Sequence, residues 1–445
     1  MLSNSLIALL GIALLILVVN LPVHVVFKFV LGIAAMYLIS KLFSRQTGIK
    51  DDWGMLMVRS KAGLRTIDAL AKNENAWKLF ADLGTVVAYG TLSFFIIRRP
   101  LKERALVVFA GLVVLSLLSL LVAPVVFPFL IGILGTEGLA AKSSVATGSQ
   151  SALVAAGLLY LGGFSLMVFG SLISYAVVVL SAVIGALFFG THTIQTIAPG
   201  ATLILPGINI PFAEGIIALA LILLVHEGAH AVLARIARVK ILSSGVVLLG
   251  VLPIGAFVEP DEDQLKKVDS EKQSRVLVAG STANLFASLA AFFLFLGFLF
   301  VTVPYKESGL LVVGGNQSGT VIYTINGQNA STFAAGNLTA NSTLAIGSSR
   351  GAYEVTLGKG QFSYYDLSST FFLAKYSNPA LEFIYNLLGL IFSLNFVIGI
   401  VNLLPLPFFD GYRLLELNVD KKMAVTAISW IAALAFLVNF LPWFF

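Results

Sequence analysis

The stretch "LLVHEGAHAVLAR", residues 223–235, places two histidines and a glutamate inside a long hydrophobic run. The run covers residues 212–236, which is long enough for a membrane-spanning helix. Ionisable groups at membrane depth are energetically costly, and they usually mark a functional site. His226, Glu227 and His230 are therefore the first candidates for a site.

The composition of the whole chain predicts a polytopic α-helical membrane protein. Of 445 residues, 58% are hydrophobic and 11% are charged, against about 25% charged in soluble domains. The net charge of +6 fits basic residues concentrated in cytoplasmic loops. The absence of cysteine excludes disulfides, thiolate nucleophiles and cysteine zinc ligands. No nucleic-acid-binding motif is present, so nucleic acid is not an expected partner.

Hydrophobic runs of spanning length predict about eight to ten membrane spans. The first run reads as a retained anchor rather than a cleaved signal peptide, because it lacks a basic start and a small-residue cleavage site. Residues 83–97 suit a short span, a re-entrant segment or a buried helix, and residues 59–80 suit an amphipathic surface helix. The full runs are 4–20, 23–43, 105–134, 151–171, 172–190, 212–236, 276–303, 378–404 and 424–445.

Residues 304–375 differ from the rest of the chain, because they are rich in Gly, Ser, Thr and Asn. Apolar residues also alternate with polar ones in "GTVIYTINGQ". This pattern predicts a small β-rich domain outside the bilayer. The segment has four Lys or Arg in 72 residues, whereas the loop 235–275 has seven in 41. The positive-inside rule therefore places 304–375 outside the cell and 237–275 and 411–423 in the cytoplasm. All four glycosylation triplets lie in the outer segment, at Asn316, Asn329, Asn337 and Asn341.

The spacing of the two histidines fits a metal site. Residues four apart on a helix share one face, about 6 Å apart, so His226 and His230 can present two imidazoles to one ion. Glu227 is offset around the helix, where it can take a proton from an attacking water and pass it to the leaving amine. The alternative is a pair of core histidines with a coincidental glutamate, but an unpaired glutamate in lipid is costly.

The candidate for a third ligand is Asp410, in "NLLPLPFFDGYRLLE", residues 402–416. Catalytic zinc usually takes three protein ligands. Under the predicted topology, both motifs lie at the cytoplasmic ends of their spans, so Asp410 can approach the histidines. The alternative is an ordinary helix-ending turn made by Asp410 and Gly411.

Together these motifs resemble the site-2 protease family of intramembrane zinc metalloproteases. HEGAH is followed by N-x-x-P-x-x-x-x-D-G from Asn402, "AGSTANLF" at 279–286 is similar to the family's G-x-x-x-N helix, and "GVVLLGVLPIGAFVEPDE" is similar to its re-entrant β-hairpin. The resemblance covers about residues 195–445 and implies a PDZ-like domain at 304–375. It implies His226, His230 and Asp410 as ligands of one Zn²⁺ and Glu227 as general base. Asn402 would hydrogen-bond the substrate backbone or the oxyanion, unless it only terminates its helix.

The expected organisation has four segments. They are an N-terminal multi-span region of unknown role (1–190), a first catalytic membrane part (195–303), the PDZ-like insertion (304–375) and a second catalytic part (376–445). The expected function is intramembrane endopeptidase activity on single-span proteins in the cell membrane, with the active site toward the cytoplasm. A hairpin at 243–258 could pair with an unwound substrate strand. The alternatives are a membrane-anchored protease with a soluble catalytic domain, a transporter, and an inactive scaffold.

Overall fold

A computed structural model describes residues 4–444 except 23–24, 50, 53, 62, 135–148, 198, 203, 208, 314–319, 333–342, 357–362 and 368–370. It is mostly helical, with two small antiparallel sheets, which confirms the expected fold class. The chain forms two compact units. The first unit consists of Met1–Lys78 and Leu223–Val276, and the second of Leu79–Ile222 and Leu277–Phe445. Both units therefore combine segments that lie far apart in the sequence.

Six helical stretches in the described part of the chain are long and apolar enough to cross a membrane. They are Leu101–Val126, Leu153–Phe189, Phe212–Ile236, Ser270–Tyr305, Pro379–Val401 and Lys422–Phe444. Two more predicted spans are helical but weaker candidates. Helix α1 (Asn4–Asn20) has only 17 residues, and α2 (Val25–Thr47) carries Lys28, Lys41 and Arg45. The predicted spans therefore exist as helices, with different lengths and polarities.

Helix α8 (Ser149–Phe189) covers the two spans expected at 151–171 and 172–190. Its one non-helical residue is Gly163, at φ 62° and ψ −160°, so the break lies eight residues before the expected boundary. A Cβ at Gly163 would lie 2.6 Å from the Tyr89 nitrogen. The chain bends here because this glycine meets the backbone at the end of α4 (Glu74–Tyr89).

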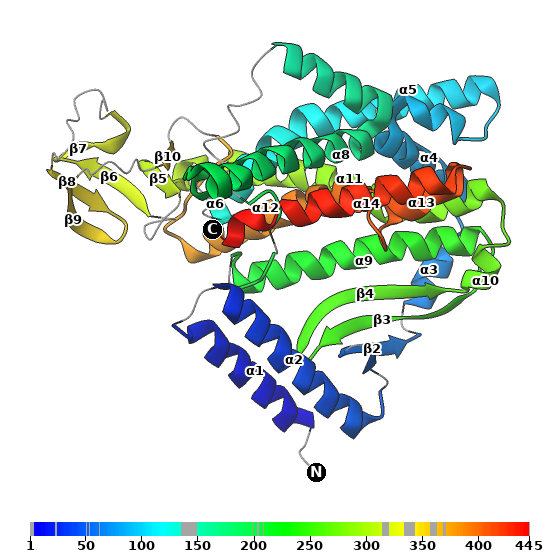
Figure 1. The fold of residues 1–445 in the computed structure, drawn as a ribbon, viewed down its shortest axis with the longest axis horizontal. Coiled ribbons are helices and arrows are strands. Elements are labelled where there is room, and N and C mark those ends of the chain that lie inside the picture. The colour runs from blue at the N-terminus through cyan, green and yellow to red at the C-terminus, as the bar shows by residue number, and fades with distance from the viewer. Residues whose placement is uncertain are drawn as a thin grey trace. The chain divides into compact units, whose positions relative to one another are not determined.

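The first unit contains a four-stranded sheet in the order β1-β2-β3-β4, of which β2, β3 and β4 are labelled in Figure 1. Strands β3 (Ile241–Leu249) and β4 (Leu252–Pro260) form the hairpin that the sequence predicts at 243–258. Strand β2 (Met55–Ser60) pairs antiparallel with β3, and β1 (Asp51–Asp52) with β2. A Cβ at Gly245 would collide with the Val58 carbonyl, so the glycine admits β2. The single surface helix expected at 59–80 is replaced by the end of β2, α3 (Leu64–Leu70) and the start of α4.

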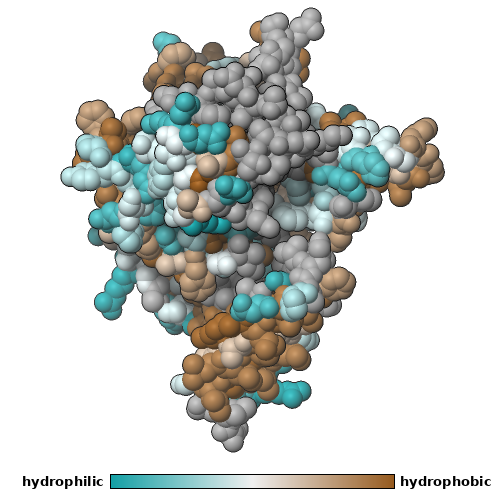
Figure 2. All heavy atoms as spheres, turned by 90° about the vertical axis from the view of Figure 1, so that its left-hand side faces the viewer, coloured by the Kyte–Doolittle hydropathy of each residue, from teal (hydrophilic) through white to brown (hydrophobic). Residues whose placement is uncertain are grey.

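Helices α1 and α2 pack on the tip of this hairpin. Ile7, Met36 and Ile39 form a buried cluster that includes Leu249 and Val251 as partly buried members. The Gly250 amide donates to Ser40 Oγ at 2.6 Å. The opposite faces of both helices carry exposed leucine, isoleucine and phenylalanine side chains, visible as the lower hydrophobic region of Figure 2. Such a continuous apolar surface is typical of contact with lipid or a partner.

The second unit contains the remaining long helices and the β-rich segment. Residues 83–97 form the end of α4 and the turn η1 (Gly90–Phe95). Val86, Val87 and Ala88 of the helical part are fully buried, which favours the buried helix among the three alternatives, whereas Phe95 of the turn is exposed. The helices of this unit also include α8, α5 (Leu101–Leu117), the π-turn η2 (Leu118–Val122), α6 (Ala123–Leu134), α12 (Pro379–Val401), α13 (Asp410–Asn418) and α14 (Lys422–Val438). Helices α9 (Phe212–Ile236) and α11 (Ser270–Thr302) begin in one unit and end in the other.

A six-stranded antiparallel sheet forms within residues 310–366, as the sequence pattern predicts. Its order is β10-β5-β6-β8-β9, with β7 paired to β6. The strands are β5 (Leu310–Val313), β6 (Val321–Ile325), β7 (Gln328–Asn329), β8 (Thr343–Ser348), β9 (Gly351–Thr356) and β10 (Ser363–Asp366). Asn329 is exposed on β7, and the other three glycosylation triplets begin outside the described residues. The likeness to a PDZ domain, the outer location and the four-segment organisation remain predictions.

Candidate metal centre

The C-terminal half of α9 carries the first motif, within the first unit. One face of this helix is fixed by packing, because Ala231 and Val232 are buried against Ile67 of α3 and a partly buried Val258 of β4. Ala229, Ala231 and Ala234 of the same helix are all buried. The rigid backing holds the helix while His226, Glu227 and His230 project from its remaining surface.

The two histidines converge at their Nε2 atoms, which lie 3.2 Å apart. His230 Nδ1 lies 2.7 Å from the Val276 carbonyl oxygen. Because a carbonyl only accepts hydrogen bonds, Nδ1 carries the proton and the lone pair of His230 stands on Nε2. Two nitrogens bound to tetrahedral zinc at about 2.0–2.1 Å would be about 3.3 Å apart. The histidine pair therefore fits one zinc ion, with the Val276 carbonyl orienting His230 from behind.

Glu227 is held by the hairpin. Its Oε2 accepts a hydrogen bond of 3.0 Å from the backbone amide of Val258 on β4. The carboxylate is partly buried, one residue from His226 but on a different side of the helix. The structure thus places the expected general base at the side of the histidine pair, with one oxygen already engaged by a strand.

The second motif lies in the second unit, between α12 and α13. Helix α12 ends at Val401 with Asn402 as its C-cap, and Asp410 is the first residue of α13. The Gly411 amide donates to the Asn402 carbonyl at 2.8 Å and closes the loop that contains Pro405 and Pro407. A Cβ at Gly411 would lie 2.6 Å from the Leu404 carbonyl oxygen and closer still to that of Leu403. Gly411 is therefore required for this closure, which fixes the position of Asp410.

The structure gives Asn402 a structural task through its main chain, since its carbonyl accepts the loop-closing bond. This observation accounts for its position without a role in substrate binding. Asn284 of α11 is fully buried. A Cβ added at Gly399 of α12 would lie 3.3 Å from the Cβ of Asn284, so Asn284 packs closely against α12. A contact of Asn402 with substrate remains a prediction.

The sequence did not predict two groups that support the site, the Val258 amide and the Val276 carbonyl. Both are backbone atoms, so no residue type at either position signals the interaction. Val276 lies three residues before the start of the "AGSTANLF" segment, and Val258 lies in the predicted hairpin. The motifs indicated the right segments, but the pairing of atoms depends on the folding of α11 and β4 against α9.

Comparison with known proteins agrees with this arrangement. The family model described as "Peptidase family M50" matches residues 214–443, which include both motifs. An uncharacterised protein of Methanocaldococcus jannaschii is 38% identical over 125 residues, covering 27% of this chain and 33% of that protein. The match thus spans about a third of the relative's length. No solved structure matches the chain.

Proposed function

The chain belongs to peptidase family M50, and on that basis we propose that it is a zinc endopeptidase that cuts membrane-anchored proteins within or near their transmembrane helices. Family membership indicates a metallopeptidase, and the six apolar helices indicate a multi-pass membrane protein. The observation that carries the proposal is the histidine pair of α9, whose Nε2 atoms converge at 3.2 Å beside a fixed glutamate.

The proposed ligands of one zinc ion are His226, His230 and Asp410. Each of these residues offers one ligand atom of a kind that binds zinc. Two imidazoles and one carboxylate are a donor set that suits catalytic zinc, with a position left for substrate or water. The proposal assigns Asp410, from the second motif, to the site that the first motif begins.

Bound zinc would supply a Lewis acid for the scissile carbonyl. Glu227 would act as general base and later as general acid toward the leaving amine. The Val258 amide holds Glu227 Oε2, so Oε1 is the oxygen that would take the proton from the attacking water. The Val276 carbonyl would keep His230 in the tautomer that presents Nε2.

Strand β4 is the proposed docking edge for the substrate. A helical substrate hides its scissile carbonyl in intrahelical hydrogen bonds, so cleavage in lipid requires an unwound strand with replacement partners. Strand β3 already has β4 on one side and β2 on the other. In the part of the chain that the structure describes, β4 has no second strand partner, so its outer edge next to Val258, whose own amide is held by Glu227, would accept an added strand beside the proposed general base.

The proposed partners are single-span membrane proteins and the lipid bilayer itself. The proposed topology puts the site toward the cytoplasm and residues 304–375 outside the cell, on the evidence of the basic-residue distribution. A transporter or an inactive scaffold with the same fold would show no zinc-dependent cleavage.

The test is zinc content per purified chain together with cleavage of a model transmembrane peptide. We expect about one zinc in the wild type and a sharp loss in Asp410→Ala. Asp420→Ala is the matched control, because Asp420 is an exposed carboxylate just beyond the same helix. Zinc retention by Asp410→Ala would remove Asp410 from the ligand set. Metal-replete wild type without cleavage of any transmembrane peptide would contradict the protease function.

A further inference from the structure

A cavity of about 420 Å³ in the first unit lies where the C-terminal end of α9 meets the first turns of α4 and α11. This volume falls within the range of pockets for small ligands. Three of its lining residues, Leu233, Ile236 and Ala237, come from the end of α9 and form an apolar floor. The remaining lining residues are all charged: Glu74, Lys78, Arg238, Glu271, Lys272 and Arg275.

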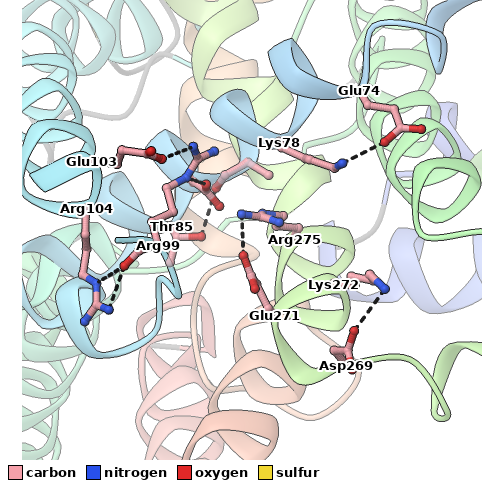
Figure 3. Close-up of polar contacts among 12 residues, drawn as sticks. Glu74, Lys78, Thr85, Arg99, Glu103, Arg104, Asp269, Glu271, Lys272 and Arg275 are labelled. Carbon is pink, nitrogen blue, oxygen red and sulfur yellow. Dashed lines mark hydrogen bonds and ion pairs between the residues drawn. The ribbon is translucent and has the colours of Figure 1, made fainter. Parts of the chain in front are cut away.

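The charged lining is positive, since four cations stand against two carboxylates. Two of the cations are neutralised locally, Lys78 by Glu74 at 2.7 Å and Arg275 by Glu271 at 2.6 Å (Figure 3). Arg275 is well enclosed, with a side-chain exposure of 12%. Lys272 pairs with Asp269, outside the lining, at 3.0 Å. Within the part of the chain that the structure describes, Arg238 makes no ion pair within 4.0 Å, and its charge adds to the effect of Lys78 in lowering the pKa of Glu74. The cavity therefore keeps a positive charge that its own carboxylates do not balance.

Arg238 occupies a backbone position that normally favours glycine. Its φ is +64°, and such left-handed geometry costs a side-chain-bearing residue free energy. The Val239 amide bonds to the Ala234 carbonyl and the Arg238 amide to the Arg235 carbonyl, both at 2.9 Å. This pair of bonds is the Schellman motif, in which glycine is the usual residue at the position of Arg238. The chain thus places an arginine in a strained position at the cavity wall.

The cavity also receives the N-terminal end of a long helix. Helix α11 begins at Ser270, and its first turns supply Glu271, Lys272 and Arg275. Helix N-termini attract anions, because their first amides lack intrahelical partners. The C-terminal end of α9 adds little negative potential to the cavity, because the Schellman hydrogen bonds already satisfy carbonyls of its last turn. Positive side chains and a helix N-terminus therefore act on the same space.

We propose that this cavity binds a phosphate group, as carried by an anionic phospholipid headgroup or by a soluble phosphate compound. Arginine forks match phosphate oxygens and lysine adds a point charge. Both α9 and α11 are apolar enough to span a membrane, and the cavity lies at their ends, at the level expected for headgroups. A bound phosphate would join the end of α9 to the first turns of α11. Arg275 directly precedes Val276, whose carbonyl orients His230, so the ligand would stabilise the support of a proposed zinc ligand.

The test measures the thermal unfolding midpoint of the full chain in neutral detergent during titration with phosphatidylglycerol. Phosphatidylcholine and inorganic phosphate are titrated in parallel arms. The key variant is Arg238→Gly, which removes the guanidinium and relieves the left-handed strain. We expect its midpoint without ligand to equal or exceed that of the wild type. Its apparent affinity for phosphatidylglycerol should fall about tenfold to a hundredfold, the value of one charged hydrogen-bond pair.

Lys267→Gln is the matched control, because Lys267 is exposed in the same charged loop and does not line the cavity. Its affinity should stay within about twofold of the wild type for the same probe. An equal loss of affinity in both variants would overturn the proposal and indicate diffuse attraction to the charged surface. If neither phosphatidylglycerol nor phosphate raised the midpoint, the proposal would be overturned as well. If inorganic phosphate alone produces the Arg238-dependent shift, the site holds and its ligand is soluble. A shift confined to phosphatidylglycerol assigns it to the headgroup.

Discussion

Replacing Gly411 with alanine is expected to damage the second motif without touching a proposed ligand. The added Cβ would lie 2.6 Å from the Leu404 carbonyl oxygen, whereas real Cβ atoms essentially never approach within 3.0 Å of another heavy atom. Moving residue 411 outward would stretch its 2.8 Å bond to the Asn402 carbonyl. Losing this bond costs about 0.5–1.5 kcal/mol, and overpacking adds about 1–3 kcal/mol. The expected destabilisation is about 2–4 kcal/mol.

The effect on the proposed metal site follows from the same displacement. Asp410 directly precedes Gly411, so the carboxylate would move with it, and zinc affinity should fall about tenfold to a hundredfold, as for lost supporting contacts. Zinc affinity is measured by competition with a chelator, and stability by the thermal midpoint. The control is Gly297→Ala on α11, because a Cβ there would meet nothing within 4 Å. If Gly411→Ala binds zinc and unfolds like the Gly297 variant, the loop does not position Asp410 as described.

Three further outcomes are expected. Glu227→Gln should keep about one zinc per chain, because the amide keeps the shape of the side chain. It should lose peptide cleavage, because the amide cannot take a proton. Metal analysis measures the zinc content, and a peptide cleavage assay measures the activity. Asp82→Ala should lower the free energy of unfolding by about 1–3 kcal/mol, because the 3% exposed Asp82 pairs with Arg99 at 2.6 Å, while Arg99 would keep its longer contact with Glu103 at 3.6 Å; chemical denaturation measures it. Lys306→Met should raise the midpoint near neutral pH, because burial lowers the Lys306 pKa to about 8. In the unfolded chain Lys306 keeps its proton up to its ordinary pKa of 10.5, whereas the folded chain loses it at a lower pH. The free energy of unfolding of the wild type therefore rises as pH increases between the two pKa values.

Each of these outcomes has a comparison that can contradict it. For Glu227→Gln, loss of zinc together with activity would mean a structural rather than a proton-transfer role. For Asp82, the comparison is Arg59→Ala, which breaks the exposed pair with Glu259 and should cost less than about 1 kcal/mol. An equal cost for both pairs would contradict the burial argument. For Lys306→Met, the gain over the wild type should shrink above pH 8, and a gain that is constant across pH would exclude charge burial as its cause.

The sequence alone determined the features that depend on local pattern. Uninterrupted apolar runs predict membrane helices wherever they occur, since their backbone groups must be satisfied within the segment. Alternation and turn residues predicted the hairpin and the β-rich segment, which the structure confirms at Ile241–Leu249 with Leu252–Pro260 and at the six strands between residues 310 and 366. The spacing of His226 and His230 placed them on one helical face, where their Nε2 atoms indeed converge.

Only the tertiary structure decided the contacts between distant segments. It showed β2 on the edge of β3, the Val258 amide on Glu227, and the Val276 carbonyl behind His230. These interactions use backbone atoms, which every residue carries, so no pattern of side chains could predict them. The sequence did not predict the cavity that Arg238 lines, because its charged residues come from segments that lie far apart in the chain. Folding alone brings the start of α4, the end of α9 and the start of α11 around one space, because burial of their apolar faces outweighs the repulsion of the like charges gathered there.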